Sequence, residues 1–583
     1  MQKYSFSKTD FRLFLEFLRY LLPYRKKQLV IFFLSGISIL LTLVNPYLSK
    51  LFVDNALIDK QIKTFIVVGA IGVGVFILNG LIKAAESFIS RTLRSKLNFD
   101  LNKRVFKKLQ ELPLEFFQDK STGEHMFRIS NDITSTVDFI VSVPDQIIRT
   151  VPSLIFILVI IFYLDWQMAS FSLILTPILY LPIYYFTGKM RVLLEEMLSY
   201  SQHIFKHLAE VFSHMYLVKS LGREQSETRK YLRAVIKNIR ISLKSLRLEI
   251  ISSFVGSSLN RILIGLITLF GAYQVFRGRL TAGTLTAILL YLSQMIGLQN
   301  SLANLTQRIS LGLISCKRLK EILYSGSAQQ HFGKQRINIR GLKIGFHNIS
   351  FGYRPKEHIL NRVNFSIDQG WISLAGASGC GKSTIINLLL GLYQPWLGEI
   401  SIDGFVLRQM DLTFLKEQIG IVLQEPFLWN DTVENNIRYL RPTASREQIE
   451  ECARISGVGE FLKDLPQGYK SLIGENACRL SEGQKQKIAI ARALINEPKI
   501  LILDEAMSSM DSSSEEKIIQ EIKKLPINIV IIVSHRLSSI AGSDLVYFLK
   551  NPNEIIIDQP LELIKKDKEF NRLFAAQLKD GLK

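Results

Sequence analysis

Residues 371–390 read WISLAGASGCGKSTIINLLL, and this stretch decides the fold of the second half of the chain. Residues 371–375 have the apolar pattern of a buried strand, and residues 385–390 have the pattern of a helix. Residues 376–384 between them match the motif GxxxxGKS in the strand–loop–helix context that it requires. The glycines let backbone N–H groups close around phosphates, and the following helix presents its positive end. The stretch therefore predicts a phosphate-binding loop.

The polar side chains of this loop have separate predicted roles. Lys382 reaches the β- and γ-phosphate oxygens, and the Ser383 hydroxyl is placed to ligate Mg²⁺. We expect the nucleotide to contact Gly376, Ser378, Gly379, Cys380, Gly381, Lys382, Ser383 and Thr384.

A second apolar strand, residues 499–503, runs into Asp504 and Glu505. An acid at a strand end can hold the magnesium shell, and its neighbour can act as a general base on water. Two adjacent acids are weak evidence alone, but they become strong evidence downstream of a phosphate-binding loop. We therefore predict that this half of the chain hydrolyses a nucleotide, with Asp504 as a metal ligand and Glu505 as the base.

The charge of the chain is unevenly distributed. Of 72 Lys plus Arg and 51 Asp plus Glu in 583 residues, residues 343–583 hold 29 and 30. The remaining 43 basic and 21 acidic residues lie in residues 1–342, together with the long apolar stretches. This pattern excludes disorder and argues against nucleic acid as a partner. The four cysteines form no CxxC pair, which argues against a zinc site or a disulfide framework and favours a reducing compartment.

Six apolar windows in the first half are long enough, or nearly so, to cross a bilayer, which takes roughly 20 residues. Asp145 and Arg149, four residues apart at the start of the third window, can pair across one helical turn. Arg261 interrupts the fifth window where it extends back toward residue 250. The predicted spans are Gln28–Ser49, Thr64–Ile82, Thr150–Leu164, Trp166–Gly188, Ile262–Phe276 and Leu280–Gln307.

The basic residues between the spans predict the orientation. Links after the second and fourth spans are long and basic, and Arg25–Lys27 precedes the first span on the same side. Both termini are therefore expected in the cytoplasm. The helical patterns of 83–140 and 189–250 predict that spanning helices continue beyond the membrane. Residues 11–22 fit a helix lying in the cytoplasmic interface better than a cleaved signal peptide.

Residues 480–484 read Leu-Ser-Glu-Gly-Gln, and with the motifs above the C-terminal part resembles the nucleotide-binding domain of an ABC transporter. The six spans with two long cytoplasmic links resemble the exporter-type permease fused ahead of it. The resemblance covers nearly the whole chain. It implies an α-helical membrane domain of six transmembrane helices with long cytoplasmic extensions in residues 1–320, a linker in 321–342, and an α/β P-loop ATPase domain in 343–583.

The resemblance also assigns roles to single residues. It implies that Tyr353 stacks on adenine, that Gln424 senses Mg²⁺ and the attacking water, and that His535 meets the γ-phosphate. Residues 508–511 match the loop that couples two ATP sites. The remaining nucleotide contacts implied by the family are Ser481, Gly483, Gln484 and Asp511, and the metal contacts are Ser383, Gln424 and Asp504.

Members of this family close two ATPase domains head to tail, with ATP between one P-loop and the partner's signature. A chain with one permease and one ATPase domain is then a half-transporter whose partner is a second such chain. Glu482 stands where glycine is usual in the signature. Because Glu505 and His535 are both present, a homodimer is favoured, and a heterodimer remains open. Residues 112–117 with 122–124, and residues 218–224, resemble the two segments that couple the domains.

The resemblance implies ATP-driven export or flipping of an amphipathic lipid, drug or peptide across the cytoplasmic membrane by alternating access. Two alternatives stay open: an importer on the same permease, and a regulatory subunit that gates a partner. Arg261 is a candidate contact for an anionic headgroup or a peptide carboxylate, or it snorkels or pairs with Asp145. The polar residues of the last span line a pathway or bond between helices: Gln294, Gln299, Asn300 and Asn304.

Overall fold

The computed structural model describes residues 8–118, 122–175, 180–326, 332–354, 356–474, 477 and 479–580. The chain divides into two compact units, Met1–Ser325 and Gly326–Lys583. The described residues of the first unit form helices joined by short links, with no strand among them, and the second is an α/β unit. The predicted order of an all-helical part followed by an α/β part is confirmed.

Helices far longer than a membrane is thick dominate the first unit. At 1.5 Å per residue, α3 with 50 residues is about 75 Å long, against about 30 Å for the hydrocarbon core. The elements are α1 (Lys8–Leu18), η1 (Arg19–Tyr24), α2 (Arg25–Leu51), η2 (Phe52–Ile58), α3 (Ile62–Glu111), α4 (Leu114–Gln118), α5 (Thr122–Phe127), η3 (Arg128–Asp132), α6 (Ile133–Leu164), α7 (Trp166–Leu175), α8 (Tyr180–Ser213), α9 (Met215–Ser220), α10 (Glu224–Phe276) and α11 (Ala282–Leu323).

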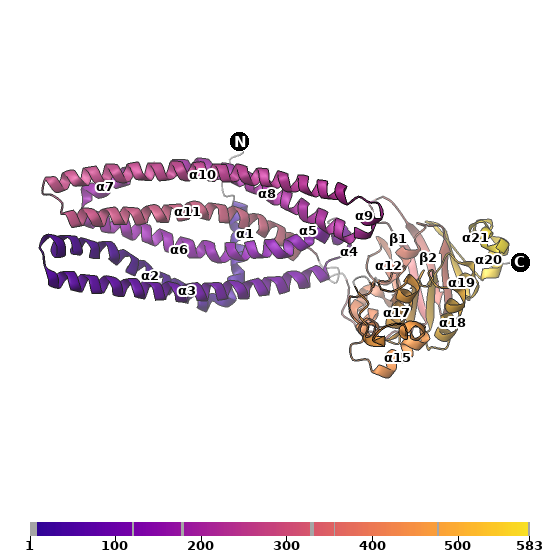
Figure 1. Cartoon of the computed structure of the whole chain (residues 1–583). Helices are drawn as coiled ribbons and strands as arrows, with labels where there is room; N and C mark the ends of the chain where they lie inside the picture. The colour runs from indigo at the N-terminus through magenta and orange to yellow at the C-terminus, as the bar shows by residue number, and fades with distance from the viewer. Residues whose placement is uncertain are drawn as a thin grey trace. The chain divides into compact units, whose positions relative to one another are not determined.

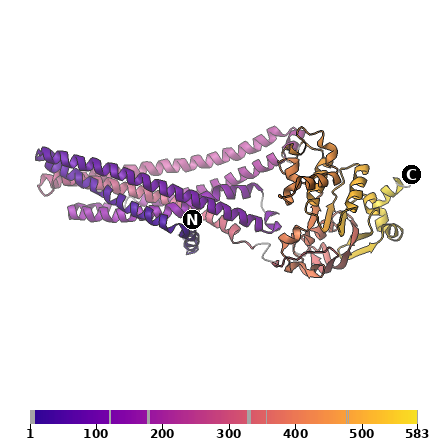
Figure 2. The ribbon, with the colours of Figure 1, turned by 90° about the horizontal axis from the view of Figure 1, so that it is seen from below.

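The long helices of this unit lie side by side, and α8 with α10 forms a pair that separates from the others at one end. Figure 1 shows α8 and α10 along one side, α2 and α3 along the other, and α6 and α11 between them, and Figure 2 shows α8 and α10 parting from the rest toward one end. The most extensive contact between two helices of this unit is between α6 and α11. A Cβ on Gly312 of α11 would lie 2.2 Å from the Phe139 ring of α6, so only glycine lets this ring pack there.

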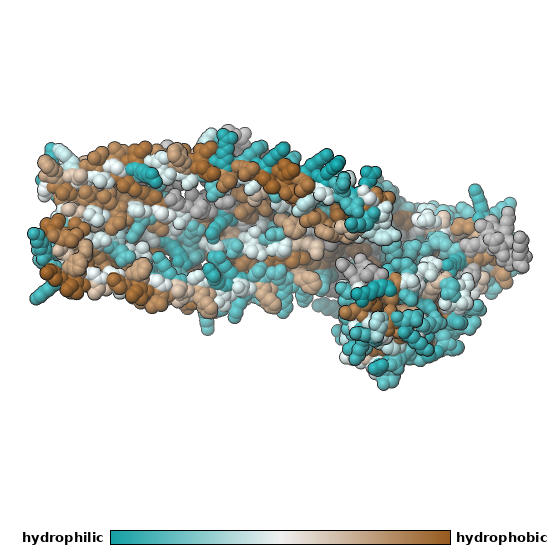
Figure 3. Space-filling model, viewed as in Figure 1, coloured by the Kyte–Doolittle hydropathy of each residue, from teal (hydrophilic) through white to brown (hydrophobic). Residues whose placement is uncertain are grey.

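The described residues include five helices long and apolar enough to cross a membrane: Lys8–Ile58, Ile62–Glu111, Gly123–Leu164, Glu224–Phe276 and Ala282–Gln299. The remaining predicted span, 166–188, includes residues 176–179, which lie outside the described residues, with α7 and α8 on either side. Figure 3 shows hydrophobic surface over the half of the unit that carries the α2–α3 and α10–α11 turns. This half is the part that lipid would cover.

Helix α1 lies across the long helices (Figure 1). Leu13 and Phe17 are buried against the bundle, whereas Phe11 and Leu15 are exposed. The helix predicted for the membrane interface therefore packs one apolar face on protein and leaves another face free.

The interior of the bundle holds a charged cluster. Arg149 pairs with Asp145 on its own helix, with Nε–Oδ1 at 3.1 Å, as the spacing predicts. Arg149 also donates to Glu86 of α3 at 2.9 Å, and Ser35 of α2 donates to the same carboxylate. Because Asp145 is paired with Arg149, the alternative of a pair with Arg261 is wrong; Arg261 is exposed on α10.

Two of the polar residues predicted for the last span are seen in α11. Gln294 donates to the Thr42 carbonyl at 3.4 Å, and Gln299 is buried. The side chains of Asn300 and Asn304 lie outside the described residues.

The second unit contains two sheets. A six-stranded sheet has the order β10-β9-β3-β8-β7-β6, with β9, β3, β8, β7 and β6 parallel, and a four-stranded antiparallel sheet has the order β2-β1-β4-β5. The central strands are unbroken apolar runs because helices cover both faces of a parallel sheet. The strands are β1 (Lys343–Phe351), β2 (Leu360–Asp368), β3 (Gly370–Gly376), β4 (Leu397–Ile402), β5 (Phe405–Val406), β6 (Ile419–Val422), β7 (Ile500–Asp504), β8 (Ile529–Val533), β9 (Leu545–Asn551) and β10 (Glu554–Asp558).

Helices of this unit flank the parallel sheet, and α17 packs on β6. They are α12 (Lys382–Leu389), α13 (Leu412–Lys416), α14 (Val433–Ile437), α15 (Arg446–Ile455), α16 (Gly459–Leu462), α17 (Glu482–Leu494), α18 (Ser512–Lys523), α19 (Leu537–Ala541), α20 (Pro560–Lys566) and α21 (Lys568–Asp580).

Candidate functional site

The candidate site lies at the carboxyl ends of four neighbouring parallel strands, β3, β8, β7 and β6. The phosphate-binding loop follows β3, Gln424 follows β6, Glu505 follows β7 and His535 follows β8. Loops at this edge of an open α/β sheet meet in one crevice, which is where such folds bind ligands. Residues more than 150 positions apart in the sequence are brought together in this way.

The loop after β3 has a backbone that needs glycine. Gly376, Gly379 and Gly381 have φ of +150°, +80° and +110°, a region that side chains rarely adopt. Gly381 is the residue immediately before α12, so the loop delivers its N–H groups to the helix N-terminus. Ser378 and Ser383 are exposed at this edge, whereas Thr384 is buried. This backbone fits a bound phosphate chain.

Lys382 is held over the loop. Its side chain is buried, and Nζ donates to the carbonyls of Gly376 at 2.8 Å and Ala377 at 3.0 Å. Its Nζ also lies 4.0 Å from the Cys380 sulfur. The ammonium group is therefore directly beside the backbone groups that would receive phosphate.

Tyr353 lies beside the first turns of α12. Its hydroxyl is 3.3 Å from the Thr384 hydroxyl and accepts from Asn387 Nδ2 at 3.3 Å. The ring packs edge-on against Phe351 and Tyr393, yet the residue is 44% exposed. An exposed aromatic face next to the phosphate loop suits a stacked base.

The structure brings Gln424, Glu505 and His535 into direct contact. Gln424 Nε2 donates to one Glu505 carboxylate oxygen at 2.7 Å, and His535 Nε2 lies 3.0 Å from the other. Glu505 itself has a φ of +47°, a strained conformation for a non-glycine residue, and such strain is concentrated at functional sites. A carboxylate oriented from two sides can accept a proton from water.

Asp504 supplies a second carboxylate at the end of β7. Burial raises the pKa of Asp504, and the adjacent Glu505 raises it further, while Lys382 and His535 oppose both effects. A divalent cation relieves this concentration of negative charge. Together with the Ser383 hydroxyl and the Gln424 amide, Asp504 offers the oxygen ligands that Mg²⁺ prefers, so the residues present fit that ion.

Comparison with known proteins agrees with this geometry. The sequence profile of the ABC transporter transmembrane region matches residues 29–299, and the profile named ABC transporter matches residues 360–508. An ATP-dependent lipid A-core flippase of Syntrophus aciditrophicus is 32% identical over 549 residues, which are 93% of this chain and 90% of that protein. This chain belongs to the ABC transporters.

Other relatives agree on the exporter type. A candidate multidrug export ATP-binding/permease protein of Bacillus subtilis is 30% identical over 96% of this chain and 98% of that protein. The structure of a bacterial Atm1-family ABC exporter with ATP bound superposes with a TM-score of 0.86 at 26% identity, covering 95% of this chain and 99% of that one. The predicted exporter-type half-transporter, and its ATPase-coupled transport by alternating access, are confirmed. Half-transporters of this fold act as dimers.

The ABC signature begins helix α17. Ser481 is its N-cap, and Ser481 and Gln484 form a capping box in which each side chain bonds the other's backbone N–H. Glu482, the departure from the family pattern, is exposed and pairs with Lys485 at 2.7 Å. A Cβ on Gly483 would lie 3.2 Å from the Ser509 carbonyl oxygen, so the signature touches the 508–511 loop.

Asp511 ends that loop as the N-cap of α18. It accepts from Ser514 N at 2.9 Å and from the Ser513 hydroxyl at 2.7 Å, and these bonds lower its pKa. The predicted site residues thus form two groups. The first surrounds the phosphate loop and Glu505, and the second, Ser481, Gly483, Gln484 and Asp511, surrounds the start of α17 and α18.

Sequence reasoning missed three residues that connect these groups: Gln486, Glu515 and Arg536. Gln486 and Glu515 are buried polar residues of α17 and α18, and Arg536 follows His535 directly. Their only signal in the sequence is proximity to a motif, which does not reveal what they contact.

Proposed function

We propose that this ABC transporter exports or flips an amphipathic molecule as a homodimer in the cytoplasmic membrane, with both termini in the cytoplasm. The observation that carries the proposal is the contact of Gln424, Glu505 and His535 beside the phosphate loop. One chain thereby holds every candidate catalytic group. The proposed cargo is an amphipathic lipid, drug or peptide. The names of the relatives, a lipid A-core flippase and a multidrug export protein, support this class. The domain limits 1–320, 321–342 and 343–583 belong to the proposal.

The arrangement of the sheet supports a site shared between two chains. Helix α17 packs on β6, whereas the phosphate loop follows β3, three strands away, which is about 14 Å at 4.8 Å per spacing. A signature at that distance suits the ATP of a second copy. In addition, only five residues of the 53-residue α10 are buried, which leaves a long apolar face for a partner and for lipid.

The roles of the side chains follow from their positions. Lys382 exchanges its two loop carbonyls for β- and γ-phosphate oxygens of ATP, and Tyr353 stacks on adenine. Glu505 accepts the proton of the attacking water, Gln424 orients that water, and His535 donates to the γ-phosphate. Ser383, Asp504 and Gln424 would hold Mg²⁺, which neutralises phosphate charge when bound.

Complementation between two inactive chains tests the shared site. Lys382→Ala disables the phosphate loop, and Gly483→Asp places bulk and negative charge in the signature. In a mixed dimer, one site combines the intact loop of the Gly483→Asp chain with the intact signature of the Lys382→Ala chain. We expect co-reconstitution to restore about a quarter of wild-type ATPase activity, because half of the dimers are mixed and each holds one complete site. Co-assembly without restored activity would contradict the shared site.

Transport itself is tested in vesicles. We expect the wild-type chain, reconstituted alone with ATP, to move a fluorescent phospholipid between leaflets, and Lys382→Ala to lose this activity. If the wild-type chain hydrolyses ATP but moves neither this lipid nor an amphipathic dye or peptide, the proposed cargo class is wrong.

A further inference from the structure

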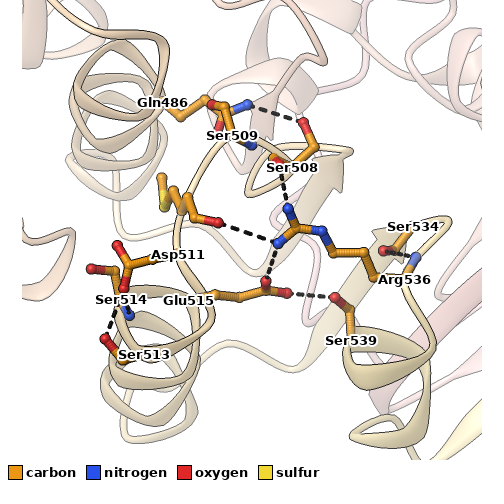
Figure 4. A network of polar contacts seen from close by, with 11 residues as sticks. Gln486, Ser508, Ser509, Asp511, Ser513, Ser514, Glu515, Ser534, Arg536 and Ser539 are labelled. Carbon is orange, nitrogen blue, oxygen red and sulfur yellow. Dashed lines mark hydrogen bonds and ion pairs between the residues drawn. The ribbon is translucent and has the colours of Figure 1, made fainter. Parts of the chain in front are cut away.

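Hydrogen bonds from two elements hold the loop before α18, residues Ser508–Asp511. One set comes from Arg536, after β8, and the other from α17. Arg536, which follows His535, donates to the carbonyls of Ser508 and Met510, the latter at 3.3 Å. Figure 4 shows the guanidinium group between this loop and Glu515. Because Arg536 follows His535 directly, a backbone displacement at His535 moves the residue that holds the loop.

The buried carboxylate of Glu515 holds the Arg536 guanidinium group in place. Arg536 donates to Glu515 Oε2 at 3.0 Å, and Ser539 of α19 donates to Oε1. Glu515 is only 5% exposed, so its charge needs both partners. The arginine has three acceptors set at fixed angles, which its planar fork matches and a lysine ammonium group does not.

The second grip comes from the signature helix. Gln486 of α17 donates to the Ser508 hydroxyl at 3.4 Å and accepts from Ser509 N at 3.3 Å. It is 2% exposed and lies one turn after Gly483, whose Cα faces the Ser509 carbonyl. Because Gln486 and Gly483 both contact this loop, a displacement of the loop also displaces the start of the signature helix α17.

We propose that Arg536, Glu515 and Gln486 are positioning residues that relay the state of one ATP site to the other. His535 responds to the γ-phosphate on its own chain, Arg536 passes the displacement to Ser508–Met510, and Gln486 passes it to the signature, which serves the ATP of the second copy. A cavity of about 160 Å³ bounded by Glu505, His535, Arg536 and Glu515 leaves this loop room to move. The relay rests on the proposed dimer.

The experiment measures ATPase activity of the full chain in lipid against ATP concentration. For Arg536→Lys, we expect kcat to fall about 10-fold and the Hill coefficient to fall to about 1, with KM changed less than about twofold, because the lysine keeps one acceptor of three. Glu515→Gln, which keeps the shape of the carboxylate, should also lose cooperativity. Gln486→Ala should do the same, and combining it with Arg536→Lys should cost little more, since both act on one relay.

A matched control is the Arg454–Glu521 pair, which joins α15 to the same helix α18 at 2.7 Å and in which Arg454 is exposed and Glu521 is half-buried. Arg454→Lys should leave kcat and the Hill coefficient unchanged. A second readout is amide exchange, which should accelerate at residues 508–511 in Arg536→Lys and not in Arg454→Lys.

The outcomes separate the two proposals. If the wild-type chain is cooperative and Arg536→Lys keeps its Hill coefficient and its slow exchange, the relay is overturned and the dimer stands. If the wild-type chain hydrolyses ATP with a Hill coefficient of 1, the relay is overturned, whereas the shared-site dimer is overturned only by failed complementation between Lys382→Ala and Gly483→Asp. Loss of kcat with cooperativity intact would reduce Arg536 to a structural residue.

Discussion

Each unit buries a glutamate and pairs it with an arginine, and the surroundings of the two pairs differ. Glu86 in the helical unit is 1% exposed and pairs with Arg149 of another long helix. Glu515 in the α/β unit is 5% exposed and pairs with Arg536, which lies beside a candidate catalytic histidine. Each arginine links segments that are distant in sequence.

The other partners of the two arginines show what each pair is for. The other N–H groups of Arg149 donate to the carboxylate of Asp145, so this cluster joins charged side chains of long helices. The other N–H groups of Arg536 donate to the backbone carbonyls of the Ser508–Asp511 loop. We propose that the charges inside the bundle stabilise the fold, whereas those at the sheet edge position groups for ATP hydrolysis. Substitutions in the first region should change stability, and those in the second should change activity.

The largest expected stability effect comes from Arg149→Ala. It leaves the buried Glu86 and the nearby Asp145 without their shared cation, which should cost about 3 kcal/mol of unfolding free energy, the lower end for an orphaned buried charge. Glu86→Gln leaves a neutral Arg149–Asp145 pair and should cost only about 1 kcal/mol. Thermal unfolding of the full chain in lipid measures both.

Arg261→Ala is the control for this comparison, because that arginine is exposed on α10 and should tolerate removal. Equal losses in Arg149→Ala and Arg261→Ala would contradict a stabilising role for the buried cluster.

Alkylation of Cys380 should block ATPase activity while leaving stability unchanged. Its sulfur is half-buried inside the phosphate loop, 4.0 Å from Lys382 Nζ, so an added group occupies the space of phosphate. MgATP should protect, and Cys380→Ala should be insensitive to the reagent. Cys452 should stay unreactive because burial raises the pKa of its thiol to about 11. Stoichiometric labelling of Cys380 with full activity would overturn this prediction.

The smallest effect has the opposite sign. Because burial and Glu505 raise the pKa of Asp504, its ionised form destabilises the fold at pH values above that raised pKa. Asp504→Asn should therefore raise Tm by about 2 °C at pH 8 without nucleotide or metal. The gain should vanish as the pH falls below the ordinary pKa of an aspartate, where both states of the wild type are protonated. ATPase activity should be lost. A lower Tm at pH 8 would break the contrast between the two regions.

The parts of the fold and of the candidate site that could be predicted from the sequence are those encoded by short, contiguous motifs. The phosphate loop, its strand and its helix are encoded by contiguous residues, because glycines at 376, 379 and 381 specify a backbone that few other residues allow. The pair of Asp145 and Arg149 was predictable for the same reason, since helical spacing alone places them together.

Contacts between distant segments were not predictable. Arg149 meets Glu86 across 63 residues and Arg536 meets Glu515 across 21, and each contact depends on helix packing or on strand order. The predicted alternative of Asp145 with Arg261 failed because a nearer partner lies one turn away. Membrane-spanning segments, in contrast, could be predicted, because they depend on the length of an apolar stretch, which can be read from the sequence.

The measurement that tests the central claim most directly is ATPase activity of the purified chain alone in lipid, compared with Glu505→Gln. Glu505 contacts both Gln424 and His535, so its conversion to the amide removes the base and preserves the shape. The account predicts robust wild-type activity and a loss of at least about 100-fold in the variant, which should still bind ATP. Wild-type activity no higher than that of the variant, with both chains folded and binding ATP, would contradict a self-sufficient homodimer.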